Sequence, residues 1–288
     1  MASELARRVG FAVVAIPFVL LVVWYGGLPL AALLAVAAAL GTAELFDLAE
    51  RGGVRPARAY GIFSATALPL LAWLAVDRYD IGENLASNGP YLASIWLIFL
   101  LIWALASRAP AERPLSATAV TMLGVAYAGA LPATIVLMRH GAEPSRSWAG
   151  LWLVCFPLAV TWVCDTAAMF GGRTFGGPKL SPVVSPGKTR SGTLAGVVGA
   201  LLVAPIFSAW VFPRYAVDLS LGRCLAIAAV LSVAGQLGDL AESLFKREAG
   251  VKDSSQLLPG HGGILDRLDS LYFVMPVTAA MYRFFGVI

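Results

Sequence analysis

Residues 193–213 read TLAGVVGALLVAPIFSAWVFP, a stretch without a charged side chain. As a helix this stretch is roughly 30 Å long, which matches the hydrocarbon core of a bilayer. Apolar blocks of about 17 to 23 residues recur along the chain, as transmembrane helices require. They lack the alternation in period two that marks a transmembrane β-barrel. The sequence therefore predicts an all-α fold in a polytopic integral membrane protein.

The composition of the chain agrees with this prediction. Of the 288 residues, 59% are hydrophobic and 13% are charged, whereas an ordinary soluble domain has about 25% charged residues. The mean hydropathy is +0.78, and a water-soluble globular protein is excluded. The cysteines lie in apolar runs without CxxC spacing, so we expect neither a disulfide nor a zinc site: Cys155, Cys164 and Cys224.

The apolar blocks divide the chain into about nine predicted membrane spans. They are 9–25, 28–48, 60–76, 91–106, 116–138, 149–170, 193–213, 222–242 and 268–286. The first is interpreted as an uncleaved helix rather than a signal peptide, because a second apolar run follows almost at once. We divide the chain into N-terminal transmembrane helices, 1–148, and a C-terminal transmembrane region, 149–288. The second region contains two long polar connections, 171–192 and 243–267.

The distribution of basic residues predicts the orientation in the membrane. Fifteen of the 21 Lys and Arg residues fall at the N-terminus and in the even-numbered connections, and six fall on the other side. Cytoplasmic loops carry the excess of basic residues. We therefore expect a cytoplasmic N-terminus, an external C-terminus, and both long connections in the cytoplasm. The net charge of +4 has the same explanation, and no nucleic-acid partner is expected.

Carboxylates within apolar spans are candidates for function, because each costs roughly 2.5 to 3.5 kcal/mol on insertion scales. Glu44 and Asp47 lie near the end of span 28–48, and Arg51 follows Asp47 at the spacing of a helical ion pair. A structural role is the favoured interpretation for both. Asp165 has no charged neighbour in its apolar span, which favours a functional role. His140, in a short external connection, is interpreted as a solvated loop residue.

A dense polar group follows span 222–242. Four of its side chains share one helical face at spacings of three and four: Asp239, Glu242, Ser243 and Lys246. The connection continues as KREAGVKDSSQLLPGHGGILDRLD over 246–269. Carboxylates, cations and glycines together are what a metal and phosphate site requires. A solvated helix end is the alternative interpretation.

The other long connection, 171–192, reads GGRTFGGPKLSPVVSPGKTRSG and contains no acid. Its glycines, cations and hydroxyls suit an anionic ligand, although the spacing is not that of a Walker P-loop. Because no acid is near Lys188 in the sequence, we expect this cation to be unpaired and to contact a substrate phosphate. An ordinary cytoplasmic loop that follows the positive-inside rule is the alternative.

The stretch SLFKREAGVKDSSQLLPGHGGILDRLD, residues 243–269, resembles the signature of the phosphatidate cytidylyltransferases, also called CDP-diacylglycerol synthases. The resemblance extends upstream to Gly238–Glu242 and to Asp165 with the glycines and cations after it, and covers about 165–269. One position departs from the family pattern. Ser191 follows Ser-Pro-Gly-Lys-Thr-Arg where the family commonly has Glu, which puts the role of that carboxylate in doubt.

The resemblance implies the reaction of CTP with phosphatidic acid to give CDP-diacylglycerol and pyrophosphate. It implies a catalytic set of Asp239, Asp266, Lys246, Arg247 and His261, the last as a ligand-positioning residue and not as a base. It implies substrate binding by Lys179, Ser185, Lys188, Thr189, Ser243, Lys252 and Arg267. Asp239, Asp266, Asp269 and Asp165 would hold Mg²⁺, with room for a second cation. A homodimer in a bacterial inner membrane is also implied.

Two alternatives remain open at this point. A CTP-dependent cytidylyltransferase that acts on another phospholipid, such as an isoprenoid glycerol phosphate, fits the same motifs. An ion-coupled secondary transporter would explain the intramembrane carboxylates. The transporter is opposed by the lack of an evident inverted repeat and by the position of the polar groups, which concentrate in the connections rather than at the bilayer midplane.

Overall fold

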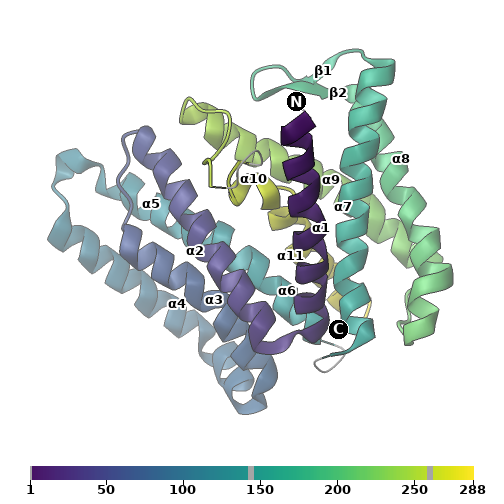
Figure 1. Ribbon diagram of the computed structural model, residues 1–288. Helices are drawn as coiled ribbons and strands as arrows, with labels where there is room; N and C mark the ends of the chain where they lie inside the picture. Colours follow the sequence, from purple (N-terminus) through teal and green to yellow (C-terminus); the bar gives the residue numbers. More distant parts are fainter. Residues whose placement is uncertain (1, 142–145, 258–261) are drawn as a thin grey trace.

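The computed structural model describes residues 2–141, 146–257 and 262–288. Its helices form one bundle (Figure 1). They are α1 (Ala2–Tyr25), α2 (Gly27–Arg51), α3 (Arg58–Asp77), α4 (Tyr79–Ser107), α5 (Pro114–Gly124), α6 (Leu131–His140), α7 (Trp148–Phe175), α8 (Arg190–Ile206), α9 (Leu221–Glu248), α10 (Leu265–Leu268) and α11 (Leu271–Phe284). A π-helical turn, Val125–Ala130, joins α5 to α6 without a break. The predicted helical membrane protein is confirmed in outline.

Seven helical stretches among the described residues are long and apolar enough to cross a membrane. They are α2, α3, α4, α7, α9, the continuous stretch Pro114–His140, and Arg190–Tyr215, which begins with α8. The described apolar part of α1, Val13–Tyr25, is shorter, and α11 has 14 residues. The count of nine spans stays a prediction, because its first and last members rest on these shorter helices.

A two-stranded antiparallel hairpin interrupts the helices between α7 and α8. Its strands are β1 (Lys179–Ser181) and β2 (Ser185–Thr189), with Lys179 opposite Thr189 and Ser181 opposite Ser185. Prolines at 178, 182 and 186 remove the backbone donors that a helix needs. The all-α prediction therefore needs this correction at the 171–192 connection, which was expected to be a loop.

The main core lies where α7, α8, α9 and α11 meet, and includes fully buried Phe156, Ile227 and Tyr282. The α7 and α8 helices approach closely through small side chains. A Cβ on Gly199 would lie 2.5 Å from the Cβ of Ala167, so only glycine permits this spacing. Small residues at such crossings are typical of helices packed within membranes.

His140 lies at the end of the bundle that holds the C-terminus, and its surroundings differ from those expected. His140 is half-buried, and its Nε2 accepts a hydrogen bond from the backbone N–H of Gly27 at 2.9 Å. Buried Arg139 donates to the carbonyls of Val23 and Trp24, both at 2.6 Å. The interpretation of His140 as a solvated residue is wrong, because the tight α1–α2 turn leaves backbone groups that these side chains satisfy.

The opposite end of the bundle carries both polar connections. The hairpin, the end of α9, and α10 all lie there, together with the start of α1 (Figure 1). The chain ends at the other side, where Gly141 contacts Ile288. Chemistry-bearing residues from distant parts of the sequence are thus brought to one end.

Candidate functional site

A cavity of about 660 Å³ opens between α7, the hairpin, α8 and α9. Five of the predicted site residues line it: Asp165, Lys179, Lys188, Thr189 and Asp239. Arg173 also lines it, with backbone of Gly172, Gly176, Gly177, Gly187 and Gly192. The cavity therefore joins three cations and two carboxylates, with glycine-rich walls that leave backbone groups accessible.

Lys188 has two partners in this cavity. Its Nζ lies 2.7 Å from Oδ2 of Asp239 and 3.4 Å from the carbonyl oxygen of Gln236. The expectation that Lys188 is unpaired is wrong. The hairpin folds back across α9, so an acid about fifty positions further along the chain becomes its neighbour, which inspection of the local sequence could not show.

Thr189 is the N-cap residue of α8 and lines the cavity. Its Oγ1 accepts a hydrogen bond from the backbone N–H of Gly192 at 3.1 Å, which is a normal helix N-cap. Ser191 donates to the carbonyl of Gly176 and lies 3.1 Å from Oγ1 of Thr189. The serine that replaces the usual Glu thus ties the end of α7 to the start of α8.

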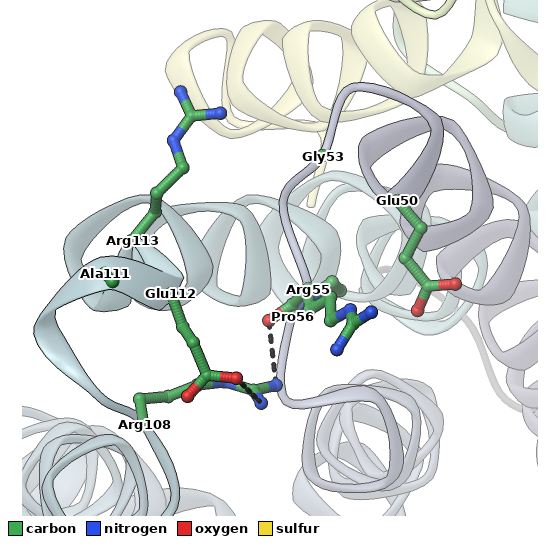
Figure 2. Close-up of a pocket in the computed structure, with 8 residues that line it drawn as sticks. All are labelled: Glu50, Gly53, Arg55, Pro56, Arg108, Ala111, Glu112 and Arg113. Atoms are coloured by element: carbon green, nitrogen blue, oxygen red, sulfur yellow. Dashed lines mark hydrogen bonds and ion pairs between the residues drawn. The ribbon is translucent and has the colours of Figure 1, made fainter.

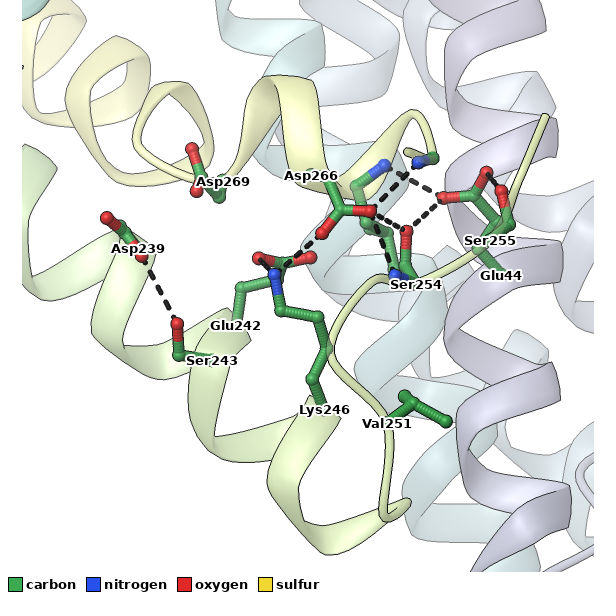
Figure 3. A network of polar contacts seen from close by, with 12 residues as sticks. Glu44, Asp239, Glu242, Ser243, Lys246, Val251, Ser254, Ser255, Asp266 and Asp269 are labelled. Atoms are coloured by element: carbon green, nitrogen blue, oxygen red, sulfur yellow. Dashed lines mark hydrogen bonds and ion pairs between the residues drawn. The ribbon is translucent and has the colours of Figure 1, made fainter. Parts of the chain in front are cut away.

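A polar network lies beside the cavity (Figure 3). Ser243 donates to Oδ1 of Asp239 at 3.2 Å. Nζ of Lys246 lies 2.6 Å from Glu242 and 2.6 Å from Asp266. The helical face predicted from spacing is therefore confirmed as two pairs of contacts, Asp239 with Ser243 and Glu242 with Lys246.

Asp266 anchors the connection that precedes it. Its Oδ2 accepts hydrogen bonds from Ser254 N and Oγ and from Gly263 N, at 2.8, 2.9 and 2.8 Å. Burial alone would raise the pKa of Asp266, but the hydrogen bonds from Lys246, Gly263 and Ser254 outweigh burial and lower it. Asp266 is a carboxylate held in its charged form.

The residues described do not form a ready-made metal cage, since no three His, Cys, Asp or Glu among them gather closely enough to hold an ion. Asp239 and Asp269 nevertheless face one another across α9 and the turn before α11 (Figure 3). Mg²⁺ commonly binds one or two carboxylates and completes its shell with substrate phosphates and water. The pair Asp239 and Asp269 would fit that mode with Mg²⁺ in place of Lys188 at Oδ2 of Asp239, whereas Asp266 accepts hydrogen bonds from Lys246, Ser254 and Gly263.

The remaining predicted residues lie outside the cavity. Arg247 donates to the carbonyls of Val184 and Val251, at 3.2 and 2.9 Å. It thus connects the hairpin to the polar connection 243–267, which we call the signature connection. Lys252 and Arg267 are exposed, and Ser185 is half-buried in β2. His261 lies outside the described residues.

Sequence reasoning missed Gln236, a residue of α9 that lines the cavity. Its Nε2 donates to the carbonyls of Ser232 and Thr193, at 3.0 and 3.5 Å. The available signal was an amide in an apolar span, one helical turn before Asp239.

The expected pairing of Asp47 with Arg51 is replaced by another. Asp47 lies 2.5 Å from Arg58 at the start of α3. A separate hollow of about 650 Å³ lies near this end, between the α2–α3 and α4–α5 connections (Figure 2). Arg108 there donates to the carbonyl of Arg55 at 3.0 Å and lies 4.0 Å from Glu112. This hollow is a junction between connections and contains none of the predicted site residues.

The bundle has the apolar helices of an integral membrane protein and a cavity lined by cations and carboxylates at one end, and comparison gives its class. The chain matches the model of the cytidylyltransferase family over residues 6–285 and belongs to that family.

Its relatives include proteins named phosphatidate cytidylyltransferase. One from Brucella suis biovar 1 (strain 1330) is 34% identical over 99% of this chain and 94% of its own length. One from Haemophilus influenzae is 44% identical over 135 residues, 47% of each chain. One from Staphylococcus saprophyticus is 47% identical over 44% of this chain and 48% of its own length.

Proposed function

We propose that this chain transfers the cytidylyl group of CTP to phosphatidic acid, giving CDP-diacylglycerol and pyrophosphate. The observation that carries the proposal is the cavity in which Lys188 meets Asp239, found in a member of the cytidylyltransferase family. Full-length similarity to a protein named phosphatidate cytidylyltransferase supports phosphatidic acid as the acceptor.

The transfer joins a phosphate oxygen of the lipid to the α-phosphorus of CTP and breaks the bond to the β-phosphate. A phosphate monoester has a second pKa near 6, so much of it is dianionic at neutral pH and needs no strong base. The demand on the protein is to bring two anions together and to stabilise the departing pyrophosphate. Arg173, Lys179 and Lys188 line the cavity and provide positive charge for this purpose.

We propose that Asp239 and Asp269 hold Mg²⁺ together with the phosphates of CTP, and Asp165, in the cavity wall, is a candidate for a second cation. Bound there, the ion would neutralise phosphate charge and act as a Lewis acid. Asp266 would act on the same site indirectly, by fixing Lys246 and the signature connection.

We further propose that the cavity opens to the cytoplasm of a bacterial inner membrane, with the C-terminus outside. The excess of basic residues on the side of the polar connections supports this orientation, and CTP is a cytoplasmic nucleotide. A homodimer remains an expectation from the resemblance.

The test is to purify the full chain in detergent and supply CTP, Mg²⁺ and an acceptor lipid. With phosphatidic acid, we expect equal amounts of CDP-diacylglycerol and pyrophosphate. A parallel reaction with an isoprenoid glycerol phosphate distinguishes the other acceptor class. No nucleotide product with either lipid would reject the proposed activity and favour the transporter interpretation.

A further inference from the structure

Glu44 of α2 is buried and receives four hydrogen bonds from the signature connection. Oε1 accepts from Ser255 Oγ at 2.7 Å and from Ile264 N at 3.0 Å. Oε2 accepts from Ser254 Oγ and from Leu265 N, both at 2.9 Å. Only 4% of Glu44 is exposed. Each oxygen therefore lies within hydrogen-bond distance of one hydroxyl and one backbone N–H, and Ser254 Oγ shares its single hydrogen between Glu44 and Asp266. Among the described residues, no cation pairs with this carboxylate.

The contacts require a carboxylate at this place. The N–H groups of Ile264 and Leu265 lie at the start of α10, where a helix lacks internal acceptors for its donors. An amide side chain would turn an NH₂ group toward one of these two backbone donors. One buried donor would then lose its partner, which is unfavourable.

Glu44 and the backbone of the signature connection also approach each other closely at Gly263. A Cβ on Gly263 would lie within 2.3 Å of Glu44 Oε2 and 2.1 Å of Ser254 Oγ. The second glycine of the His-Gly-Gly sequence is therefore required because α2 presses its carboxylate against the backbone there.

Glu44 connects to Asp266 and Lys246 through a continuous series of contacts (Figure 3). Ser254 Oγ lies 2.9 Å from Glu44 and 2.9 Å from Asp266. Asp266 in turn binds Lys246, which also binds Glu242 of α9. The position of Asp266 thus depends on an acid that is more than two hundred residues away in the sequence.

The α2 helix is itself held firmly against this region. Leu45 and Leu48 pack with Tyr127, Leu265 and Tyr272 in a separate buried cluster. Leu45 and Leu48 follow Glu44 by one and four positions, so all three share one side of α2. The carboxylate is therefore presented from a fixed support.

We infer that Glu44 is a positioning residue for cytidylyl transfer, through which the N-terminal helices set the geometry of Asp266 and Lys246. This inference rests on the proposed function. The inference gives α2 a part in the reaction. The hydrogen-bond partners of Glu44 are Ser254, Ser255, Ile264 and Leu265, and none of these four lines the cavity. Glu44 therefore acts through the signature connection rather than on CTP directly.

The decisive variant is Glu44→Gln, compared with Glu50→Gln one and a half turns further along α2. Glu50 is exposed and lies 3.6 Å from Arg58. We expect Glu44→Gln to lower kcat at least tenfold while KM for CTP changes less than threefold. Hydrogen exchange should accelerate at residues 262–268 and not in the β1–β2 hairpin. Glu50→Gln should match the wild type in all three measurements.

A milder variant keeps the test valid if Glu44→Gln does not fold. Ser255→Ala removes one of the four donors, and we expect a two- to fivefold lower kcat with faster exchange at 262–268. The double variant Glu44→Gln/Ser255→Ala should lower kcat by less than the product of the two single effects, because Ser255 Oγ acts through its contact with Glu44.

The two proposals fail in different ways. Wild-type protein that makes no CDP-diacylglycerol rejects the activity. Active wild type with unchanged kcat and unchanged exchange in Glu44→Gln, or in Ser255→Ala where the first variant does not fold, overturns the positioning role. A fall in kcat with exchange raised evenly over the whole chain would also overturn it, since that pattern indicates general destabilisation.

Discussion

Nζ of Lys188 and Oδ2 of Asp239 lie 2.7 Å apart, and their side chains are 23% and 32% exposed. The pair joins β2 to α9 in the lining of the cavity. Each group neutralises the other while the cavity holds no anion. A triphosphate would compete for Lys188, and a cation would compete for Asp239, so binding of both would exchange one ion pair for two.

We predict that Lys188→Ala lowers kcat/KM by more than tenfold, which corresponds to about 1.4 kcal/mol of transition-state stabilisation. The cavity loses a cation, and Asp239 is left without its partner. The measurement is CDP-diacylglycerol formation at varied CTP. Arg190→Ala, two residues away at an exposed position, should stay near wild type. Equal losses in both variants would show that only the overall charge of this connection matters.

We predict that activity requires Mg²⁺ and that Asp239→Asn removes most of it. The substitution keeps the size of the side chain but removes the charge that would hold the ion. EDTA should abolish product formation in the wild type, and added Mg²⁺ should restore it. Asp218→Asn, before α9 at the other end of the bundle, is the control. Full activity in EDTA would exclude the metal proposal.

We predict that Asp266→Asn lowers the free energy of unfolding by about 1–3 kcal/mol and abolishes turnover. Lys246 keeps Glu242 as a partner, so the loss is smaller than the roughly 3–5 kcal/mol for a buried charge left alone. Thermal unfolding in detergent measures the stability. An unchanged unfolding temperature would show that the contacts of Asp266 contribute little.

The difference in free energy of unfolding between the wild type and Asp266→Asn should depend on pH, because the pKa of Asp266 is lowered. A carboxyl with a lower pKa in the folded state stabilises the fold above its unfolded pKa. That contribution is lost as the pH falls through the folded-state value, below the ordinary 3.8. The wild type and Asp266→Asn should therefore differ fully near pH 7 and converge in acid.

We predict that Arg247→Ala raises KM for CTP about fivefold, or roughly 1 kcal/mol, with a smaller effect on kcat. Its guanidinium holds the hairpin rather than lining the cavity. Hydrogen exchange in β1–β2 should rise with KM. Glu248→Gln, its exposed neighbour on α9, should leave both unchanged. A large fall in kcat alone would instead favour direct participation of Arg247 in the reaction.

We predict that a cysteine added after Ile288 reacts only with reagents supplied outside the cell. The distribution of Lys and Arg predicts an external C-terminus, and the C-terminus lies at the end of the bundle away from the hairpin (Figure 1). A cysteine placed in the hairpin turn, at Val183, should show the opposite accessibility. Labelling of both from one side would contradict the orientation.

The sequence predicted well wherever the information is local. The helical face of Asp239, Glu242, Ser243 and Lys246 follows from helix periodicity, and the structure shows it as contacts. The sequence predicted poorly which side chains make contact when the two residues belong to different helices or strands. Lys188 was expected to be unpaired, and His140 was expected to be solvated, because their partners come from other elements.

By itself, the sequence determined the helical membrane class and the segments that carry polar chemistry, since hydropathy and motif spacing are read along one dimension. Only the tertiary structure decided which charges meet. Glu44 lies 221 positions from Leu265, from whose N–H it accepts a hydrogen bond, and 210 positions from Ser254, which also contacts Asp266. Such pairings depend on helix packing, which sets distances that no local pattern contains.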